Sequence, residues 1–89
     1  MGEQQATTKA LDDIKDISIE EIEKEMARLK REHPKEFEDG IRSARDVLES
    51  HRDPLYFYLV RQKHDITVEE KIRVQYVCVL QSLGIIGYL

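Results

Sequence analysis

The 89-residue sequence contains one cysteine, two prolines, four glycines and no tryptophan. A single cysteine cannot form an internal disulfide, which excludes the disulfide-rich scaffolds of small secreted proteins. The first residues do not combine a basic segment with a following apolar one, so no secretory signal peptide is expected. Together these absences predict a reducing, cytoplasmic setting.

Residue patterns for catalysis, metal binding or phosphate binding are also missing. His33, His51 and His64 are separated by eighteen and thirteen residues, which matches none of the usual zinc-ligand spacings. Cys78 follows Val77 and precedes Val79, an apolar setting that favours a buried and unreactive thiol. We therefore expect no catalytic residues, no metal site and no cofactor, and we expect that the chain is not an enzyme.

What the sequence does contain is a high density of charge together with enough apolar residues for a core. Charged residues make up 36% of the chain and hydrophobic residues 40%, with a formal net charge of −4. The acidic excess lies in residues 1–40, which carry twelve acidic and seven basic side chains, whereas residues 41–89 carry six and seven. A single chain of this length buries only about 60 to 65% of its unfolded surface, so association with a second chain would add stability.

The C-terminal segment has no formal charge. Arg73 is the last charged residue, and the sixteen residues from Val74 to Leu89 follow it. A helix that spans a bilayer needs roughly 20 apolar residues, and Gln75, Gln81 and Ser82 interrupt this shorter run. The segment therefore predicts a buried helix and not a membrane span.

Apolar periodicity and capping residues predict an all-α bundle of three to four helices. Ser18 with Glu21, and Thr67 with Glu70, have the spacing of an N-terminal capping box. Pro34 ends one helix and suits the first turn of the next. The expected elements are a disordered tail at 1–8 and a single helical domain at 9–89, with helices at 18–33, 34–51, 54–64 and 67–83 and an apolar C-terminal tail.

Two features of this scheme remain open at the level of sequence. Residues 55–60 are all apolar or aromatic and fit a buried strand as well as a helix, although Asp53 and Pro54 before them favour a helix. Gly40 lies in the middle of an expected helix, where it costs about 1 kcal/mol relative to alanine. A close helix crossing or a kink would explain it.

The last expected helix carries apolar residues on nearly all of its faces. Val68, Ile72, Tyr76, Val79 and Leu83 mark one face, and further apolar residues occupy the others, so this helix is expected at the centre of the bundle. Gly84 is placed to end the helix, and Ile85 to fold back onto it.

The apolar residues of this segment exceed what a small bundle can enclose. We therefore expect a non-catalytic interaction module, a homodimer or a complex with another protein, that associates through the C-terminal helix and tail. The expected partner-binding residues are Tyr76, Leu80, Ile85, Ile86, Tyr88 and Leu89.

An alternative is a nucleic-acid-binding regulator, because residues 54–89 resemble a degenerate helix-turn-helix. Residues 55–64 would be its first helix, and Val68 would begin the second. Two departures weaken the resemblance: no turn signal divides 68–83 into two helices, and residues 74–83 carry neither arginine nor lysine for phosphate or guanine contacts.

Overall fold

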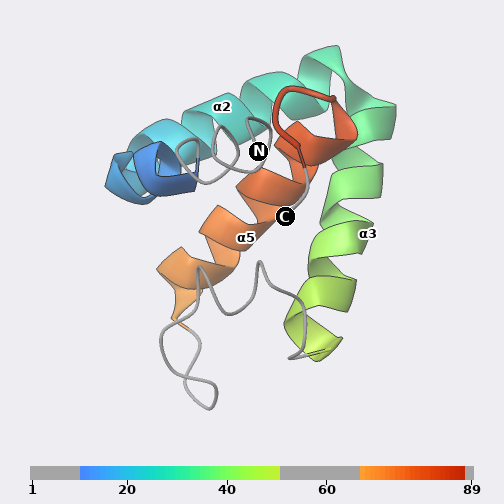
Figure 1. Ribbon diagram of the computed structural model, residues 1–89. Helices are drawn as coiled ribbons and strands as arrows, with labels where there is room; N and C mark the ends of the chain where they lie inside the picture. The colour runs from blue at the N-terminus through green and yellow to red at the C-terminus, as the bar shows by residue number, and fades with distance from the viewer. Residues whose placement is uncertain (1–10, 51–66, 88–89) are drawn as a thin grey trace.

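The computed structural model describes residues 11–50 and 67–87, and helices make up most of this part of the chain (Figure 1). A short helix covers 11–16, followed by α2 (Ile19–Glu32), α3 (Pro34–Ser50) and α5 (Val68–Ser82). The chain is thus an all-α bundle, as the sequence predicts. The expected tail at 1–8, the expected helix at 54–64 with its alternative strand at 55–60, and Tyr88 and Leu89 lie outside the described residues.

The boundaries of α2 and α3 follow from local chemistry. At the start of α2, the Ser18 Oγ accepts a hydrogen bond of 3.2 Å from the backbone N–H of Glu21. At its end, the His33 N–H donates to the Leu29 carbonyl over 2.7 Å, and α3 begins at Pro34. Proline fits there because a first-turn N–H has no partner within the helix. The expected break between two helices at Pro34 is confirmed.

The start of α5 has a complete capping box. The Thr67 Oγ1 accepts from the Glu70 N–H over 3.0 Å, and the Glu70 carboxylate accepts from the Thr67 N–H over 3.1 Å. Both hydrogen bonds give partners to backbone N–H groups that would have none at the end of an isolated helix. The box predicted from Thr67 and Glu70 is therefore present.

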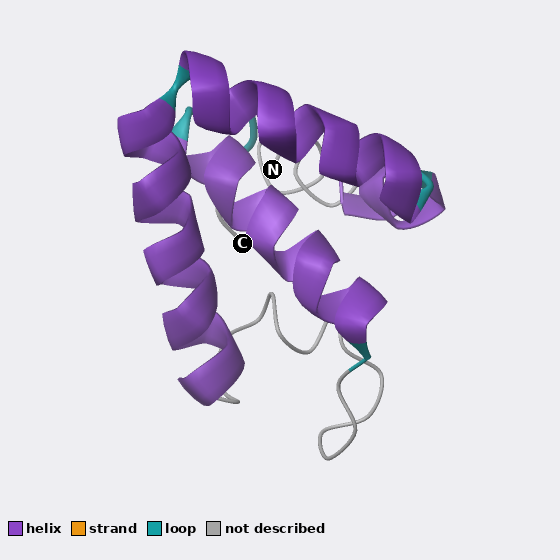
Figure 2. Cartoon of the chain, turned by 180° about the vertical axis from the view of Figure 1, so that it is seen from behind, coloured by secondary structure: helices purple, strands orange, loops and turns teal. Residues whose placement is uncertain are grey.

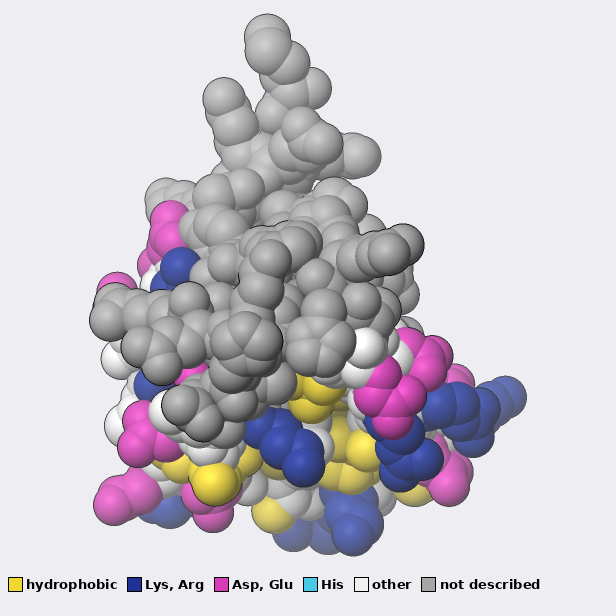
Figure 3. Space-filling model, turned by 90° about the horizontal axis from the view of Figure 1, so that it is seen from below, with side chains coloured by type: hydrophobic (Ala, Val, Ile, Leu, Met, Phe, Trp, Pro, Cys, Tyr) yellow, Lys and Arg dark blue, Asp and Glu magenta, His cyan; other side chains and the backbone are white. Residues whose placement is uncertain are grey.

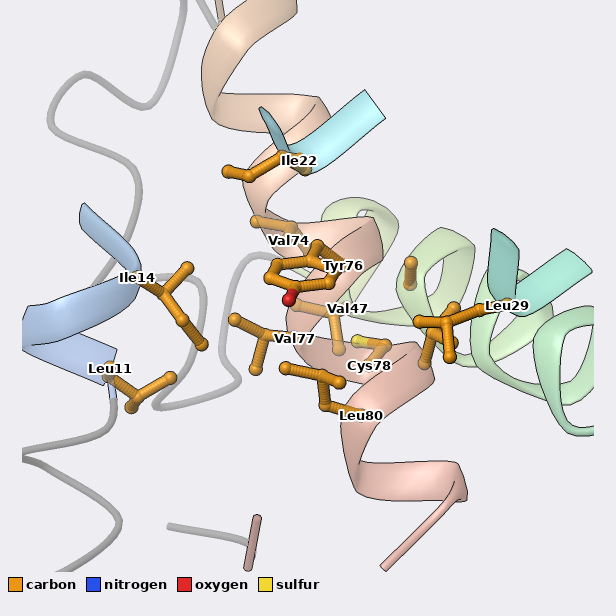
Figure 4. Packing of buried hydrophobic residues seen from close by; sticks show 12 residues of the cluster. Leu11, Ile14, Ile22, Leu29, Val47, Val74, Tyr76, Val77, Cys78 and Leu80 are labelled. Atoms are coloured by element: carbon orange, nitrogen blue, oxygen red, sulfur yellow. The ribbon is translucent and has the colours of Figure 1, made fainter. Parts of the chain in front are cut away.

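The core forms around α5, which lies between α2 and α3 when the molecule is seen from either side (Figures 1 and 2). Seven of its residues are buried: Val74, Tyr76, Val77, Cys78, Val79, Leu80 and Gln81. Leu11 and Ile14 of the first helix point toward Val77, as the close-up shows (Figure 4). This arrangement confirms the central helix expected from sequence, with one correction. Val68 was expected on the core-facing side, yet it is 73% exposed because it lies in the first turn of α5, beyond the enclosed part of the bundle.

The helices α3 and α5 lie in close contact where they cross at Gly40. A Cβ atom added at Gly40 would lie 2.5 Å from the Cα of Val79, far inside normal contact distance. Glycine is therefore required by a close crossing, one of the two explanations that the sequence offered. From this crossing the two helices diverge toward the C-terminal end of α3 and the N-terminal end of α5 (Figures 1 and 2).

Arg73 connects α5 to the end of the first helix. Its Nη1 donates hydrogen bonds to the carbonyl oxygens of Ile14 and Ile17, over 2.8 and 2.7 Å. These carbonyls lie at the C-terminal end of helix 11–16, where the negative end of the helix dipole favours a cation. The partly buried side chain of Arg73 thus holds the end of helix 11–16, which is almost sixty residues away in the sequence.

Candidate interaction surface

The C-terminal turn after α5 has a defined backbone geometry. Gly84 adopts a φ of 77°, in the left-handed region that glycine enters without strain. The N–H of Ile85 donates to the Leu80 carbonyl and that of Gly84 to the Gln81 carbonyl, each over 3.0 Å. These two bonds are the pair that defines a Schellman motif. The turn predicted from Gly84 and Ile85 is confirmed, and it directs the chain back along α5.

A buried glutamine holds the residues that follow. The side chain of Gln81 is only 7% exposed, and its Nε2 donates a 3.2 Å hydrogen bond to the carbonyl oxygen of Gly87. A buried amide needs such a partner to offset the loss of water. The bond therefore fixes the segment 84–87, which carries no charge of its own, against the end of α5.

The structure separates the residues expected to bind a partner. Tyr76 and Leu80 are 9% and 8% exposed, so they form part of the core of the protomer itself. Ile86 is partly buried and packs against this core. Ile85, in contrast, is 62% exposed. Tyr88 and Leu89 lie outside the described residues. Within the described residues of the expected set, Ile85 is thus the one presented to solvent.

The hydroxyl of Tyr76 reaches the edge of the core near α2. Burial raises the pKa of this phenol above its usual value, the negative charge of Glu25 raises it further, and the positive charge of Arg28 lowers it. Arg28 itself bridges Glu25 and Glu32 on the surface of α2, over 2.6 and 3.5 Å. Tyr76 therefore remains a neutral phenol around neutral pH, which suits a residue of the core.

Where α3 and α5 diverge, they leave a groove with a volume of about 350 Å³. Among the described residues, four of α3 and two of α5 line it: Ile41, Arg45, Leu48, Glu49, Lys71 and Gln75. Ile41 and Leu48 are partly buried hydrophobic residues, whereas Arg45, Glu49 and Lys71 are exposed at the rims. The sequence does not predict this groove, because its walls come from two helices that are distant in the chain and come together only when it folds.

The remaining described surface is strongly charged. Seen from below, acidic and basic side chains surround small areas of hydrophobic surface (Figure 3). The exposed large hydrophobic residues of the described part are Val68 and Ile85. Val68 is the first residue of α5, and Ile85 lies just after the end of this helix. The two therefore lie at opposite ends of the same helix.

Among residues 11–50 and 67–87, no three His, Cys, Asp or Glu side chains lie together in a way that would hold a metal ion. None of the described helices is both long enough and apolar enough to cross a membrane. Cys78 is 1% exposed and forms no disulfide.

The α5 helix bears on the resemblance to a helix-turn-helix. It runs without interruption from Val68 to Ser82, whereas the motif requires a turn between two helices in this region. Within the segment 74–83, which would enter a DNA groove, residues 76 to 81 are all buried in the protomer.

Comparisons with protein-family models, with curated proteins and with solved structures find no match for this chain.

Proposed function

We propose that this protein is a small non-catalytic interaction module of the cytoplasm, and that it associates with a second chain through its C-terminal turn. The observation that carries the proposal is the position of Ile85, which is 62% exposed on a turn with fixed backbone hydrogen bonds. Covering such an aliphatic side chain removes apolar surface from water, so a partner that packs against Ile85 would gain affinity from this contact.

Two energetic arguments support this function. Complete burial of an isoleucine contributes roughly 1.5–3 kcal/mol, so covering the 62% of Ile85 that is exposed would contribute about 1–2 kcal/mol, or about a 5- to 30-fold change in a dissociation constant. The bonds from Ile85 to Leu80 and from Gln81 to Gly87 order the turn before any partner arrives. Association then loses less conformational entropy than it would with an unstructured tail.

Binding to nucleic acid has less support than association with a protein, so association is the function that we propose. The part of α5 that would read bases is occupied in the core, and residues 74–83 offer no cation for phosphate. The cytoplasmic assignment is supported by the single thiol, which lies in the core.

Sedimentation equilibrium over a wide range of protein concentration tests the proposal, on the purified chain and on a mixture with proteins of its host. We expect association by the unmodified chain, and a dissociation constant at least tenfold higher for Ile85→Glu. Ala27→Glu is the matched control, because it adds the same charge at an exposed position of α2. Circular dichroism must show equal helicity in all three proteins. A chain that stays monomeric and retains no host protein through Ile85 would refute the function.

A further inference from the structure

From the hydrogen bonds at the junction between helix 11–16 and α2, we infer that these two helices form a hinge with two arrangements. In the closed arrangement, which the structure shows, the chain bends at residues 17–18 and helix 11–16 lies against α5 (Figure 4). In the open arrangement, residues 11–32 form one continuous helix, and helix 11–16 leaves α5. The hinge is independent of the proposed function, because it does not involve Ile85.

The stretch 11–32 contains no residue that forces a helix to end. It has neither glycine nor proline. In a continuous helix, Leu11, Ile22 and Leu29 would fall on one side, because eleven and seven residues separate them, or about three and two turns. The bend therefore does not follow from the helix propensity of this stretch. It depends on side chains that provide hydrogen bonds at the junction.

Arg73 occupies the carbonyl groups that a continuous helix would use. In such a helix, the carbonyl oxygens of Ile14 and Ile17 would accept from the N–H groups four residues later, those of Ser18 and Glu21. In the structure, the Arg73 Nη1 donates to both carbonyl oxygens, over 2.8 and 2.7 Å. The Ile14 carbonyl also accepts from the Ile17 N–H over 3.2 Å. Arg73 thus satisfies both acceptors at the bend in place of the α-helical backbone.

Ser18 provides for a donor on the other side of the bend. Its Oγ accepts from the Glu21 N–H over 3.2 Å, the same group that would donate to the Ile17 carbonyl in a continuous helix. Ser18 has a φ of −66° and a ψ of 149°, and this extended ψ interrupts a helix. The side chains of Arg73 and Ser18 together therefore replace backbone bonds that would join the two helices.

Packing on α5 adds to the stability of the closed arrangement. Leu11 and Ile14 are 0% and 4% exposed, and both point toward Val77 (Figure 4). A helix of six residues has little stability of its own, so in the closed arrangement it depends on this packing and on Arg73. In the open arrangement the same residues extend α2 by about two turns and gain the backbone bonds of a longer helix.

The hinge controls what covers one side of α5. The N-terminal end of α2 lies at the edge of the molecule in both ribbon views, so an extension of this helix points away from the bundle (Figures 1 and 2). Opening would carry Leu11 and Ile14 away from Val77. The hinge is thus a strap that covers apolar surface of α5 when closed and removes that cover when open.

Distances between two spin labels, measured by electron paramagnetic resonance, test the hinge. The labels are attached at Asp13→Cys and Arg31→Cys, which are exposed positions of helix 11–16 and α2. Eighteen residues separate them, so a continuous helix would place their backbones about 27 Å apart on the same side. The bend of the closed arrangement brings the labels closer together. Cys78 stays unlabelled because it is 1% exposed.

We expect the short distance to dominate in the labelled chain that is otherwise unmodified. Arg73→Met combined with Ser18→Ala should increase the population near 27 Å at least fivefold, because methionine cannot bond the carbonyls and alanine favours a helix interior. The matched control is Arg73→Met combined with Ser18→Pro. Proline accepts the φ of −66° but interrupts a continuous helix, so this control should show no population near 27 Å.

Two results would overturn the hinge. One is a distance distribution in the Arg73→Met, Ser18→Ala protein that equals that of the unmodified chain. The other is a broad distribution together with a lower helicity by circular dichroism, which would show that residues 11–17 detach without joining α2. If the whole bundle unfolds in the double variant, Ser18→Ala alone decides, since it keeps Arg73. It should increase the population near 27 Å at least twofold, and no increase would equally overturn the hinge.

Discussion

Gly40 of α3 lies against the backbone of Val79 of α5, so closely that a Cβ atom would come within 2.5 Å of the Val79 Cα and within 2.7 Å of its nitrogen. This contact sets where the two helices touch. It also sets the groove, because the helices separate on one side of the crossing and leave about 350 Å³ between them. The shape of the groove thus depends on one residue without a side chain.

Gly40→Ala should destabilise the protein even though alanine is the better helix former. Alanine would gain about 1 kcal/mol from helix propensity. Its methyl group would meet main-chain atoms of Val79, which cannot turn aside as a side-chain end can, and overpacking of this kind costs about 1–3 kcal/mol or more. We expect urea denaturation to show a free energy of unfolding lower by about 1–2 kcal/mol. Glu38→Ala, at an exposed position of the same helix, should change it by less than about 0.5 kcal/mol.

Arg73→Met should release the first helix while most of the bundle stays folded. The substitution keeps much of the aliphatic length but removes both hydrogen bonds to Ile14 and Ile17. Bonds from a charged donor typically contribute about 1.5–3 kcal/mol, so we expect a loss of about 1–3 kcal/mol at this partly exposed site. Relative to the unmodified chain, hydrogen exchange of Arg73→Met should show a larger increase in amide exchange rate for residues 11–17 than for α3. Arg73→Lys should recover part of the protection, since it retains the charge but not the two-pronged geometry.

Equal exchange of all helices in Arg73→Met would contradict this role, because it would show that the bundle unfolds as one unit. Unchanged exchange in residues 11–17 would contradict it too, because the packing of Leu11 and Ile14 alone would then hold the helix in place.

Much of the fold follows from signals that act within a few residues. The residues at the helix ends each satisfy or remove hydrogen-bonding groups of the nearby backbone: Ser18, Pro34, Thr67 and Gly84. The helix ends therefore lie within one residue of the positions predicted from the sequence. The long uncharged run after Arg73 predicts a central helix because no other place would cover its many apolar faces.

The arrangement of the surface could not be predicted in the same way. Tyr76 and Leu80 were expected to contact a partner, but the sequence does not show that α2 and α3 enclose them within one protomer. The bonds of Arg73 join residues that are 59 and 56 positions apart, and no local pattern indicates them. The groove likewise depends on the angle between two helices, which the Gly40 crossing fixes in space.

Thr67→Ala should lower stability more than Ser18→Ala. The Thr67 hydroxyl accepts from the Glu70 N–H and also lies 3.0 Å from the Glu70 carboxylate, to which it donates, whereas at Ser18 the structure shows the single bond from the Glu21 N–H. Loss of an N-cap costs about 1 kcal/mol, and Thr67→Ala also removes the bond from the Thr67 hydroxyl to the Glu70 carboxylate, although the backbone N–H of residue 67 can still donate to that carboxylate. Thermal unfolding followed by circular dichroism should therefore show the larger decrease in Tm for Thr67→Ala. Equal decreases would mean that the bond from the Thr67 hydroxyl to the Glu70 carboxylate adds nothing to stability.

Tyr76 should make the protein less stable in alkali. Burial, and then the nearby Glu25, raise the pKa of its phenol in the folded state above the ordinary value of about 10 that it takes in the unfolded chain. As the pH passes the unfolded value, the unfolded state releases its proton first, so ionisation favours unfolding. The stabilising contribution is therefore complete below about pH 10 and is lost as the pH rises toward the folded value. Urea midpoints measured from pH 7 to 11 should fall less steeply for Tyr76→Phe than for the unmodified chain, because the difference between the two proteins isolates this group from the lysines and the other tyrosines. Parallel curves would show that Tyr76 titrates in the folded state as it does in the unfolded chain, and that its hydroxyl is in contact with water.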